Sequence, residues 1–167
     1  FDGWTKEEAI REMKDGGLII SAHAGNWEAA GNLLNRLTIP FNIVMFDEEH
    51  RKIKDYLDGI MKEKNVKIIV LKDDLSHIVE IRKALDNKEL IVLHGDRYMP
   101  GSKTLTAEFL GAPARFPEGP FYLGARFGVP VSFAFAMKEG SRHYHFYATP
   151  GRVYKMADIR KTDPALL

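Results

Sequence analysis

Leu18-Ile-Ile-Ser-Ala-His-Ala-Gly-Asn-Trp-Glu28 is the stretch on which the interpretation of the whole chain depends. Its first residues, Leu18 to Ala22, form an apolar run of the length of one buried strand. Asn26 is a residue type that often caps the start of a helix, and apolar residues at helical spacing continue from Trp27 to Leu37. The stretch therefore predicts a strand, a tight turn at Gly25 and a helix.

Short apolar runs alternate with amphipathic stretches along most of the remaining chain, without a repeat or a low-complexity linker. Further strands are predicted at residues 41–46, 67–71, 90–93, 105–109, 131–136 and 143–147, the last of them at a sheet edge. Helices are predicted at residues 48–64, 76–85 and 120–127. Strands separated by helices form βαβ units, so the pattern predicts an α/β fold: a mostly parallel sheet flanked by helices, in a single domain.

Composition narrows the possible functions. The chain has 167 residues, of which 45% are hydrophobic, and a net charge of +1. The absence of cysteine excludes a thiol nucleophile, a cysteine-ligated metal and a disulfide scaffold. No apolar run approaches the roughly 18 residues of a membrane span. We find no nucleotide-binding glycine motif and no basic-aromatic pattern for nucleic acid. The ends, Phe1 and Leu167, suggest a piece of a longer polypeptide.

Catalytic residue types follow two of the predicted strands. In open α/β sheets, ligands bind beyond the carboxyl ends of the strands. The segments at this edge include His23-Ala-Gly-Asn-Trp-Glu28 and His94-Gly-Asp-Arg97. His23 comes directly after its strand, and Glu28 lies in the first turn of the next helix. If the chain turns at Gly25, the carboxylate of Glu28 can reach back to the imidazole of His23.

An imidazole paired with a carboxylate is the arrangement that activates a hydroxyl group. The neutral ring accepts the hydroxyl proton during attack, which contributes typically 10²–10⁴ in rate. The carboxylate on the other ring nitrogen fixes the tautomer and stabilises the imidazolium. We therefore assign His23 and Glu28 as the candidate catalytic pair, although a bare His-x-x-x-x-Glu spacing occurs often by chance.

A family resemblance supports this assignment. Ile19 to Glu28 resembles the His-x-x-x-x-Glu motif of the bacterial lipid A biosynthesis acyltransferases, the lauroyl and myristoyl transferases, which are distantly related to glycerolipid acyltransferases. The likeness continues, in the same order and spacing, through four later segments. These are His94-Gly-Asp-Arg97, Phe109-Leu-Gly-Ala-Pro113, Phe116-Pro-Glu-Gly-Pro120 and Leu123-Gly-Ala-Arg-Phe-Gly-Val-Pro-Val131. It covers most of the chain, from about Gly16 to Ala136.

The resemblance implies a function and a setting. It implies a glycerolipid-acyltransferase-like fold and an O-acyltransferase whose donor is a thioester of acyl carrier protein or coenzyme A, with no further cofactor. The acceptor would be a lipid A-type glycolipid or a lysophospholipid-like molecule at the cytoplasmic face of the inner membrane. Residues 1–167 would then be an acyltransferase domain that lacks a membrane-associated N-terminal segment and its C-terminal end.

Five further residues are candidates for substrate binding: Asn26, Asp96, Arg97, Arg115 and Gly119. The Arg97 guanidinium suits a phosphate of either substrate, Asp96 could hold Arg97 or cap its loop, and Arg115 could extend a basic rim. Gly119 is predicted as the N-cap of a helix whose free N–H groups could bind a phosphate or an oxyanion. Pro120 departs from the glycerolipid branch, in which Glu-Gly-Thr-Arg places an arginine in this segment.

Two alternatives stay open. One is a metal-dependent phosphoesterase, in which His23, His94, Asp96 and the Asp73-Asp74 pair would gather at the strand ends. The other is a non-catalytic lipid-binding module of the same fold. We expect no metal, because no bridging-ligand pattern is evident, and we expect His77 to lie on a helix surface.

Overall fold

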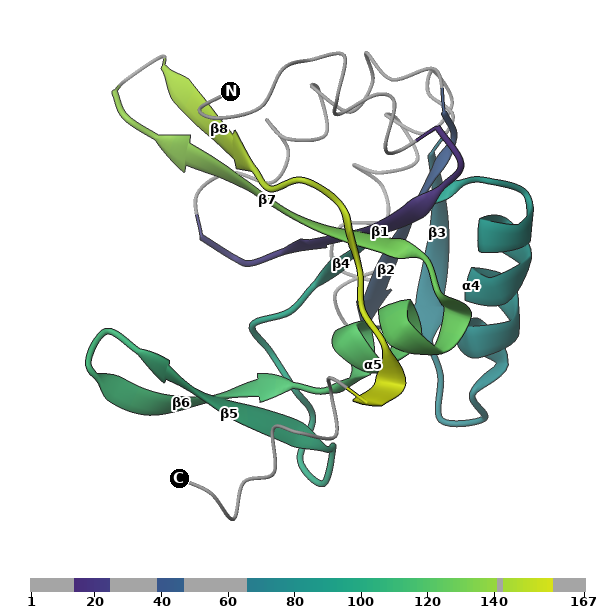
Figure 1. Ribbon diagram of the computed structural model, residues 1–167, viewed down its shortest axis with the longest axis horizontal. Helices are drawn as coiled ribbons and strands as arrows, with labels where there is room; N and C mark the ends of the chain where they lie inside the picture. Colours follow the sequence, from purple (N-terminus) through teal and green to yellow (C-terminus); the bar gives the residue numbers. More distant parts are fainter. Residues whose placement is uncertain (1–13, 25–38, 47–65, 141–142, 158–167) are drawn as a thin grey trace.

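A sheet of seven strands organises the protein in a computed structural model that describes residues 14–24, 39–46, 66–140 and 143–157 (Figure 1). The strands follow the spatial order β3-β2-β4-β1-β7-β8, and β9 also pairs with β7. Their bounds are β1 Gly17–Ser21, β2 Phe41–Phe46, β3 Val66–Leu71, β4 Leu90–His94, β7 Pro130–Lys138, β8 Tyr144–Ala148 and β9 Arg152–Val153.

Five adjacent strands of this sheet, in the spatial order β3-β2-β4-β1-β7, pair with one another in the parallel sense. In contrast, β8 and β9 pair with β7 in the antiparallel sense. Central parallel strands are buried on both faces, which explains why β1 is a continuous apolar run. Leu18, Ile19 and Ile20 are exposed by only 0%, 4% and 3%. The prediction of a mostly parallel α/β sheet is confirmed, and so is the edge position of β8.

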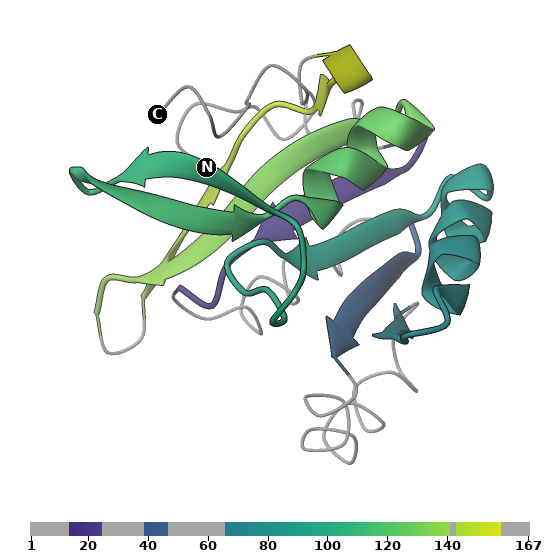
Figure 2. The same cartoon turned by 90° about the horizontal axis from the view of Figure 1, so that it is seen from below.

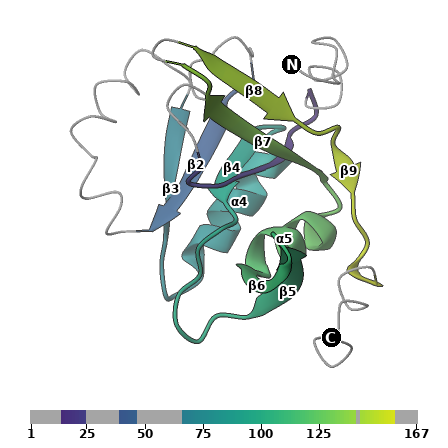
Figure 3. The same cartoon turned by 90° about the vertical axis from the view of Figure 1, so that its left-hand side faces the viewer.

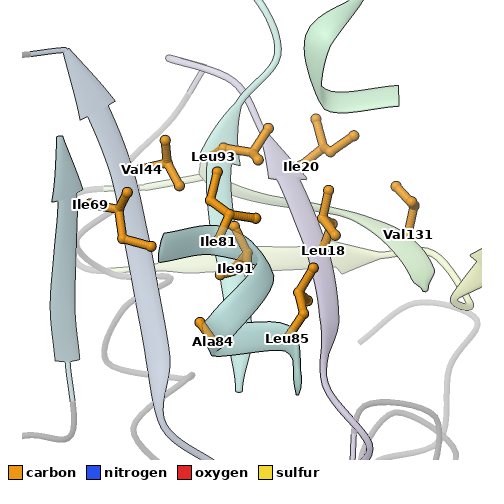
Figure 4. Packing of buried hydrophobic residues seen from close by; sticks show 10 residues of the cluster. All are labelled: Leu18, Ile20, Val44, Ile69, Ile81, Ala84, Leu85, Ile91, Leu93 and Val131. Carbon is orange, nitrogen blue, oxygen red and sulfur yellow. The ribbon is translucent and has the colours of Figure 1, made fainter. Parts of the chain in front are cut away.

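Two helices cover one face of this sheet. α4 (Ser76–Asp86) contacts β3 and β4, and α5 (Gly119–Phe127) contacts β1 and β7. Figure 4 shows Ile81, Ala84 and Leu85 of α4 among the apolar side chains of the strands. The Arg82 guanidinium lies 5.4 Å from the centre of the Phe127 ring, so a cation–π contact joins the two helices.

The opposite face of the sheet has its own apolar cluster, formed by Ile19, Phe41, Val66 and Leu90. The helices predicted at 27–37 and 48–64 lie outside the described residues. Among the residues that the structure describes, no helix combines the length and the hydropathy of a membrane-spanning segment.

A separate hairpin of two strands connects β4 to α5. Its strands are β5 (Thr104–Phe109) and β6 (Ala112–Pro117), and they extend away from the start of α5 (Figure 2). Figure 3 shows both strands beside α5, apart from the seven-stranded sheet. The sequence predicts β5 but not β6, because Pro113 and Pro117 argue against a strand. Both prolines are tolerated here because β6 pairs only with β5.

Two local predictions are corrected by the structure. α5 begins at Gly119 with Glu118 as its N-cap, so Gly119 is not the cap and the start shifts by one residue. His77 is not a surface residue: it is only 7% exposed, and its Nδ1 accepts a hydrogen bond of 3.2 Å from the Lys72 backbone N–H. His77 thus fixes the end of β3 to the start of α4.

Candidate active site

The candidate site lies where the adjacent strands β1 and β4 end together. Their register pairs Ser21 with His94, and one step further the Gly95 backbone N–H donates a 2.8 Å hydrogen bond to the Ser21 carbonyl oxygen. His23 and Asp96 each come two residues after this last pair. The parallel register therefore brings them to the same point at the carboxyl edge of the sheet.

Gly95 is required for the close approach of the two segments that follow β1 and β4. A Cβ atom added at Gly95 would lie 2.7 Å from Cγ2 of Ile20, which is closer than real Cβ atoms come to their neighbours. Ile20 is only 3% exposed and packs in the core. A side chain at position 95 would therefore displace either the core or the segment that carries Asp96.

Asp96 holds His23 through three contacts. The Nδ1 atom of His23 lies 3.0 Å and 3.2 Å from the two carboxylate oxygens of Asp96, and the His23 backbone N–H donates to Oδ2 at 2.9 Å. The side chains remain partly exposed, by 25% for His23 and 29% for Asp96. In a histidine whose Nδ1 contacts a carboxylate, Nε2 is the ring nitrogen that serves as a base toward a substrate.

The contacts with His23 also determine the charge of Asp96. Partial burial alone would raise the pKa of the Asp96 carboxyl, but the hydrogen bonds from His23 and the attraction of its ring outweigh burial and hold the pKa below its ordinary value of 3.8. Asp96 is therefore ionised near neutral pH. This is the state in which it can stabilise an imidazolium on His23.

His94 completes the cluster. Its ring centre lies 4.0 Å from that of His23, with an angle of 33° between the planes, so it packs against one face of the His23 ring. His23, His94 and Asp96 each offer a ligand atom, and these atoms lie within 4.8 Å of one another. Nitrogen and carboxylate donors of this kind suit Zn²⁺, so these three residues could hold a metal ion.

The aspartate pair that the phosphoesterase alternative requires lies elsewhere. Asp73 and Asp74 follow β3, which is separated from β4 by β2. Asp74 accepts a 2.9 Å hydrogen bond from the Ser76 backbone N–H, and this contact holds the pKa of the Asp74 carboxyl below 3.8. Asp74 thus has a structural role at the start of α4. The structure confirms the predicted gathering of His23, His94 and Asp96, without the aspartate pair.

The other predicted site residues fall into two groups. Glu28 and Asn26 lie outside the described residues, so the His-x-x-x-x-Glu contact stays a prediction. Arg97 follows Asp96 directly and is exposed. Arg115 lies on β6, where its Nε donates to the Thr104 hydroxyl at 3.0 Å and its guanidinium stands 5.4 Å from the Tyr98 ring centre.

Gly119 is the exposed first residue of α5, and the hairpin is joined to this helix start by a 3.1 Å hydrogen bond from the Glu118 N–H to the Lys103 carbonyl oxygen. The predicted roles of Asp96, to hold Arg97 or to cap its loop, stay predictions, and the structure adds a contact with His23 that the sequence did not predict. The equal offset of His23 and Asp96 from their strands follows from the bounds of β1 and β4 in the structure, and the sequence alone contains no signal for this contact.

Comparison with known families identifies the family of the chain. A sequence model of the bacterial lipid A biosynthesis acyltransferases matches residues 3–163, and the chain belongs to this family. A search of curated proteins found no match. The predicted family is therefore confirmed, and membership indicates an acyltransferase of lipid synthesis. The likeness to glycerolipid acyltransferases stays a prediction.

Proposed function

We propose that this chain is an O-acyltransferase that moves a fatty acyl group from a thioester of acyl carrier protein or coenzyme A to a lipid hydroxyl. The acceptor is a lipid A-type glycolipid or a lysophospholipid-like molecule at the cytoplasmic face of the inner membrane. One observation carries the proposal: Asp96 holds Nδ1 of His23 at the carboxyl edge of the sheet, with both side chains partly open to solvent.

The reaction proceeds in one step of direct transfer. Nε2 of His23 accepts the proton of the acceptor hydroxyl as its oxygen forms a bond to the thioester carbonyl carbon. Asp96 stabilises the imidazolium that results. The carbon–sulfur bond then breaks, and His23 returns the proton to the leaving thiolate. No acyl-enzyme is needed, which agrees with a chain that has no cysteine.

Glu28 is the second candidate carboxylate for orienting His23. Because Asp96 already contacts Nδ1, Glu28 and Asp96 are not equivalent, and their roles are separable by substituting each in turn. Among the binding candidates, Arg97 suits a substrate phosphate. The N–H groups at Gly119 and the following turn suit the oxyanion of the tetrahedral intermediate. Asn26 and Arg115 complete the proposed binding set.

The experiment compares His23→Ala with His143→Ala, which removes an imidazole that is 75% exposed and distant in sequence from the site. Acyl transfer from an acyl thioester to a detergent-dispersed lysophospholipid or lipid A precursor is followed by mass spectrometry. We expect His23→Ala to lose at least about 10³-fold in rate, as for removal of a general base, and to keep its melting temperature. Near-normal transfer by His23→Ala would refute the proposal.

The cluster of His23, His94 and Asp96 favours a metal-dependent phosphoesterase as the second candidate function. That enzyme would lose activity on chelation and regain it with added Zn²⁺ or Mn²⁺. The acyltransferase is expected to keep its rate in a chelator. Phosphate release from a phosphomonoester that depends on added metal would favour the second candidate.

A further inference from the structure

The β5–β6 hairpin has one face that is apolar from root to tip. Directly paired residues of antiparallel strands share a face, so each cross-strand pair can be assigned to one side. The pairs Leu105–Phe116, Ala107–Ala114 and Phe109–Ala112 lie on one side, and we call these six residues the apolar face. The Phe109 and Phe116 rings meet edge to face at 6.1 Å and 82°.

The tip of the hairpin continues this face into solvent. Phe109 is 56% exposed, and Leu110, the first residue of the turn, is 90% exposed. Within the part of the chain that the structure describes, no other large apolar residue is more exposed than Leu110. Two adjacent apolar side chains are thus presented at the end of a projecting element.

The residue at the turn is unusual for its conformation. Leu110 and Gly111 have φ values of 55° and 80°, as in a type I′ turn between two paired strands. Such turns favour Asn, Asp and Gly, because a positive φ is unfavourable for a side chain such as that of Leu. Neither the turn geometry nor core packing explains a leucine here, so its side chain is available for contact with another molecule.

Two cations and an aromatic ring lie behind the tip of the hairpin, and one carboxylate lies nearer to it. Arg115 lies on the face opposite the apolar one, as does the exposed Glu108 nearer the tip. Arg115 stands against Tyr98, which is 39% exposed, and Lys103 is exposed at the root. From the strand rise, Arg115 is about 13 Å from the tip. With the tip at the acyl boundary, Arg115 therefore lies just outside a headgroup layer of about 5–8 Å, within about one Debye length of its charges.

We infer that the tip of the β5–β6 hairpin inserts Phe109 and Leu110 into the headgroup boundary of an anionic phospholipid bilayer. An apolar tip with cations and an aromatic ring behind it is the arrangement of interfacial membrane contacts. Two tip side chains offer far less area than the roughly 800 Å² per partner of a stable protein interface. The inference rests on the proposed function, because a lipid acceptor is located in such a bilayer.

The first test measures binding of the chain to phosphatidylglycerol–phosphatidylcholine vesicles by flotation. The double variant Phe109→Ser with Leu110→Asn should bind about tenfold or more weakly, since it removes two exposed apolar side chains that the bilayer would bury. The matched control is Val79→Ser, which removes an apolar residue that is 71% exposed on α4 and should bind as the unaltered chain does. Equal weakening of both variants, or no change in either, overturns the inference.

Leu110→Asn alone separates a membrane role from a structural one. Asn is the better residue for this turn, so the melting temperature should stay the same or rise while vesicle binding falls by about threefold or more. A melting temperature that falls together with binding would indicate that Leu110 is structural and would contradict the inference.

A second test locates the contact directly. Because the chain has no cysteine, Leu110→Cys and Val79→Cys each create a single site for an environment-sensitive fluorophore. Anionic vesicles should shift the emission of the probe at position 110 to the blue and leave the probe at position 79 unchanged. A shift at position 110 that follows protein concentration without vesicles would point to a second copy of the chain and overturn the inference.

These outcomes remain distinct from failure of the proposed function. His23→Ala should bind vesicles as the unaltered chain does, since His23 is not on the hairpin. The double tip variant should transfer acyl groups normally to a detergent-dispersed acceptor and more slowly to the same acceptor in vesicles. Normal transfer by the tip variant in both settings would refute the inference while leaving the proposed function standing.

Discussion

The two ends of β4 carry two carboxylates with different surroundings. Glu89 precedes the strand and is 7% exposed, with its oxygens 2.8 Å from Asn42 Nδ2 and from Lys67 Nζ. Asp96 follows the strand, and its side chain is 29% exposed against His23. Each carboxylate links β4 to another strand of the parallel sheet, through β2 and β3 at one end and through the end of β1 at the other.

Glu89 and Asp96 differ in the side chains that they contact and in their exposure to solvent. The partners of Glu89 are the buried amide of Asn42 and the ammonium group of Lys67, and neither of them is an imidazole. The imidazole of His23 has two ring nitrogens, each able to carry a proton, so the contact with Asp96 can take part in proton transfer. The same physical interaction therefore stabilises the fold at one end of β4 and, we expect, serves chemistry at the other.

Of the substitutions that test this contrast, Asp96→Asn should have the largest effect. The amide keeps the shape but cannot stabilise an imidazolium on His23, so we expect acyl transfer to fall by about 10²- to 10⁴-fold. The free energy of unfolding should change by less than about 1 kcal/mol, because the contact is partly exposed. Steady-state rates and urea unfolding measure the two quantities, and exposed Asp73→Asn is the matched control.

Glu89→Ala should show the opposite pattern. It leaves the buried amide of Asn42 without its best acceptor, so we expect a loss of about 1–3 kcal/mol in the free energy of unfolding. The transfer rate of the folded protein should change by less than about twofold. The control is Glu80→Ala on α4, whose contact with Lys72 is 3.9 Å long and half exposed, and which should cost less than about 0.5 kcal/mol. A Glu89→Ala protein with a reduced transfer rate and an unchanged free energy of unfolding would contradict the contrast between Glu89 and Asp96.

Acid should weaken the stabilisation that Glu89 and Asp96 provide at the two ends of β4. This is the smallest of the three expected effects. Burial raises the pKa of the Glu89 carboxyl, but Asn42 and Lys67 outweigh it and hold the pKa below 4.5; Asp96 is likewise held below 3.8. Their stabilisation is present above these ordinary values and is lost as the pH falls through the lower values of the folded protein. Between about pH 6 and pH 3, unfolding of Glu89→Gln with Asp96→Asn should depend less on pH than that of the unaltered chain. Equal slopes would contradict the linkage.

Much of the sheet could be predicted because its strands are buried apolar runs. β2 has the predicted bounds, and the other predicted strands in the described residues differ by a few residues at most. β6 could not be predicted, because its prolines and the turn at Leu110 carry none of the usual hairpin signals. β9 has only two residues, Arg152 and Val153, which is too short for any pattern.

The site was predicted in part. His23 lies just after the end of its strand, as its position after an apolar run indicates, and the structure adds a contact with Asp96, which follows β4. The contact with Asp96 depends on the order of the strands in the sheet, which a single sequence does not specify. The contact with Glu28 stays a prediction. His77 was predicted wrongly although its spacing from Ile81, Ala84 and Leu85 places it on the buried face of α4.

The link between His23 and Asp96 has a consequence for synthesis and folding of the chain. The two residues are 73 positions apart, and their contact depends on β1 pairing with β4. A ribosome must therefore complete β2, β3 and α4 before the imidazole meets its carboxylate, and closing so large a loop costs entropy that local contacts do not repay. With the role of His23 proposed above, we expect activity to return on refolding only when β4 has joined β1 in the sheet.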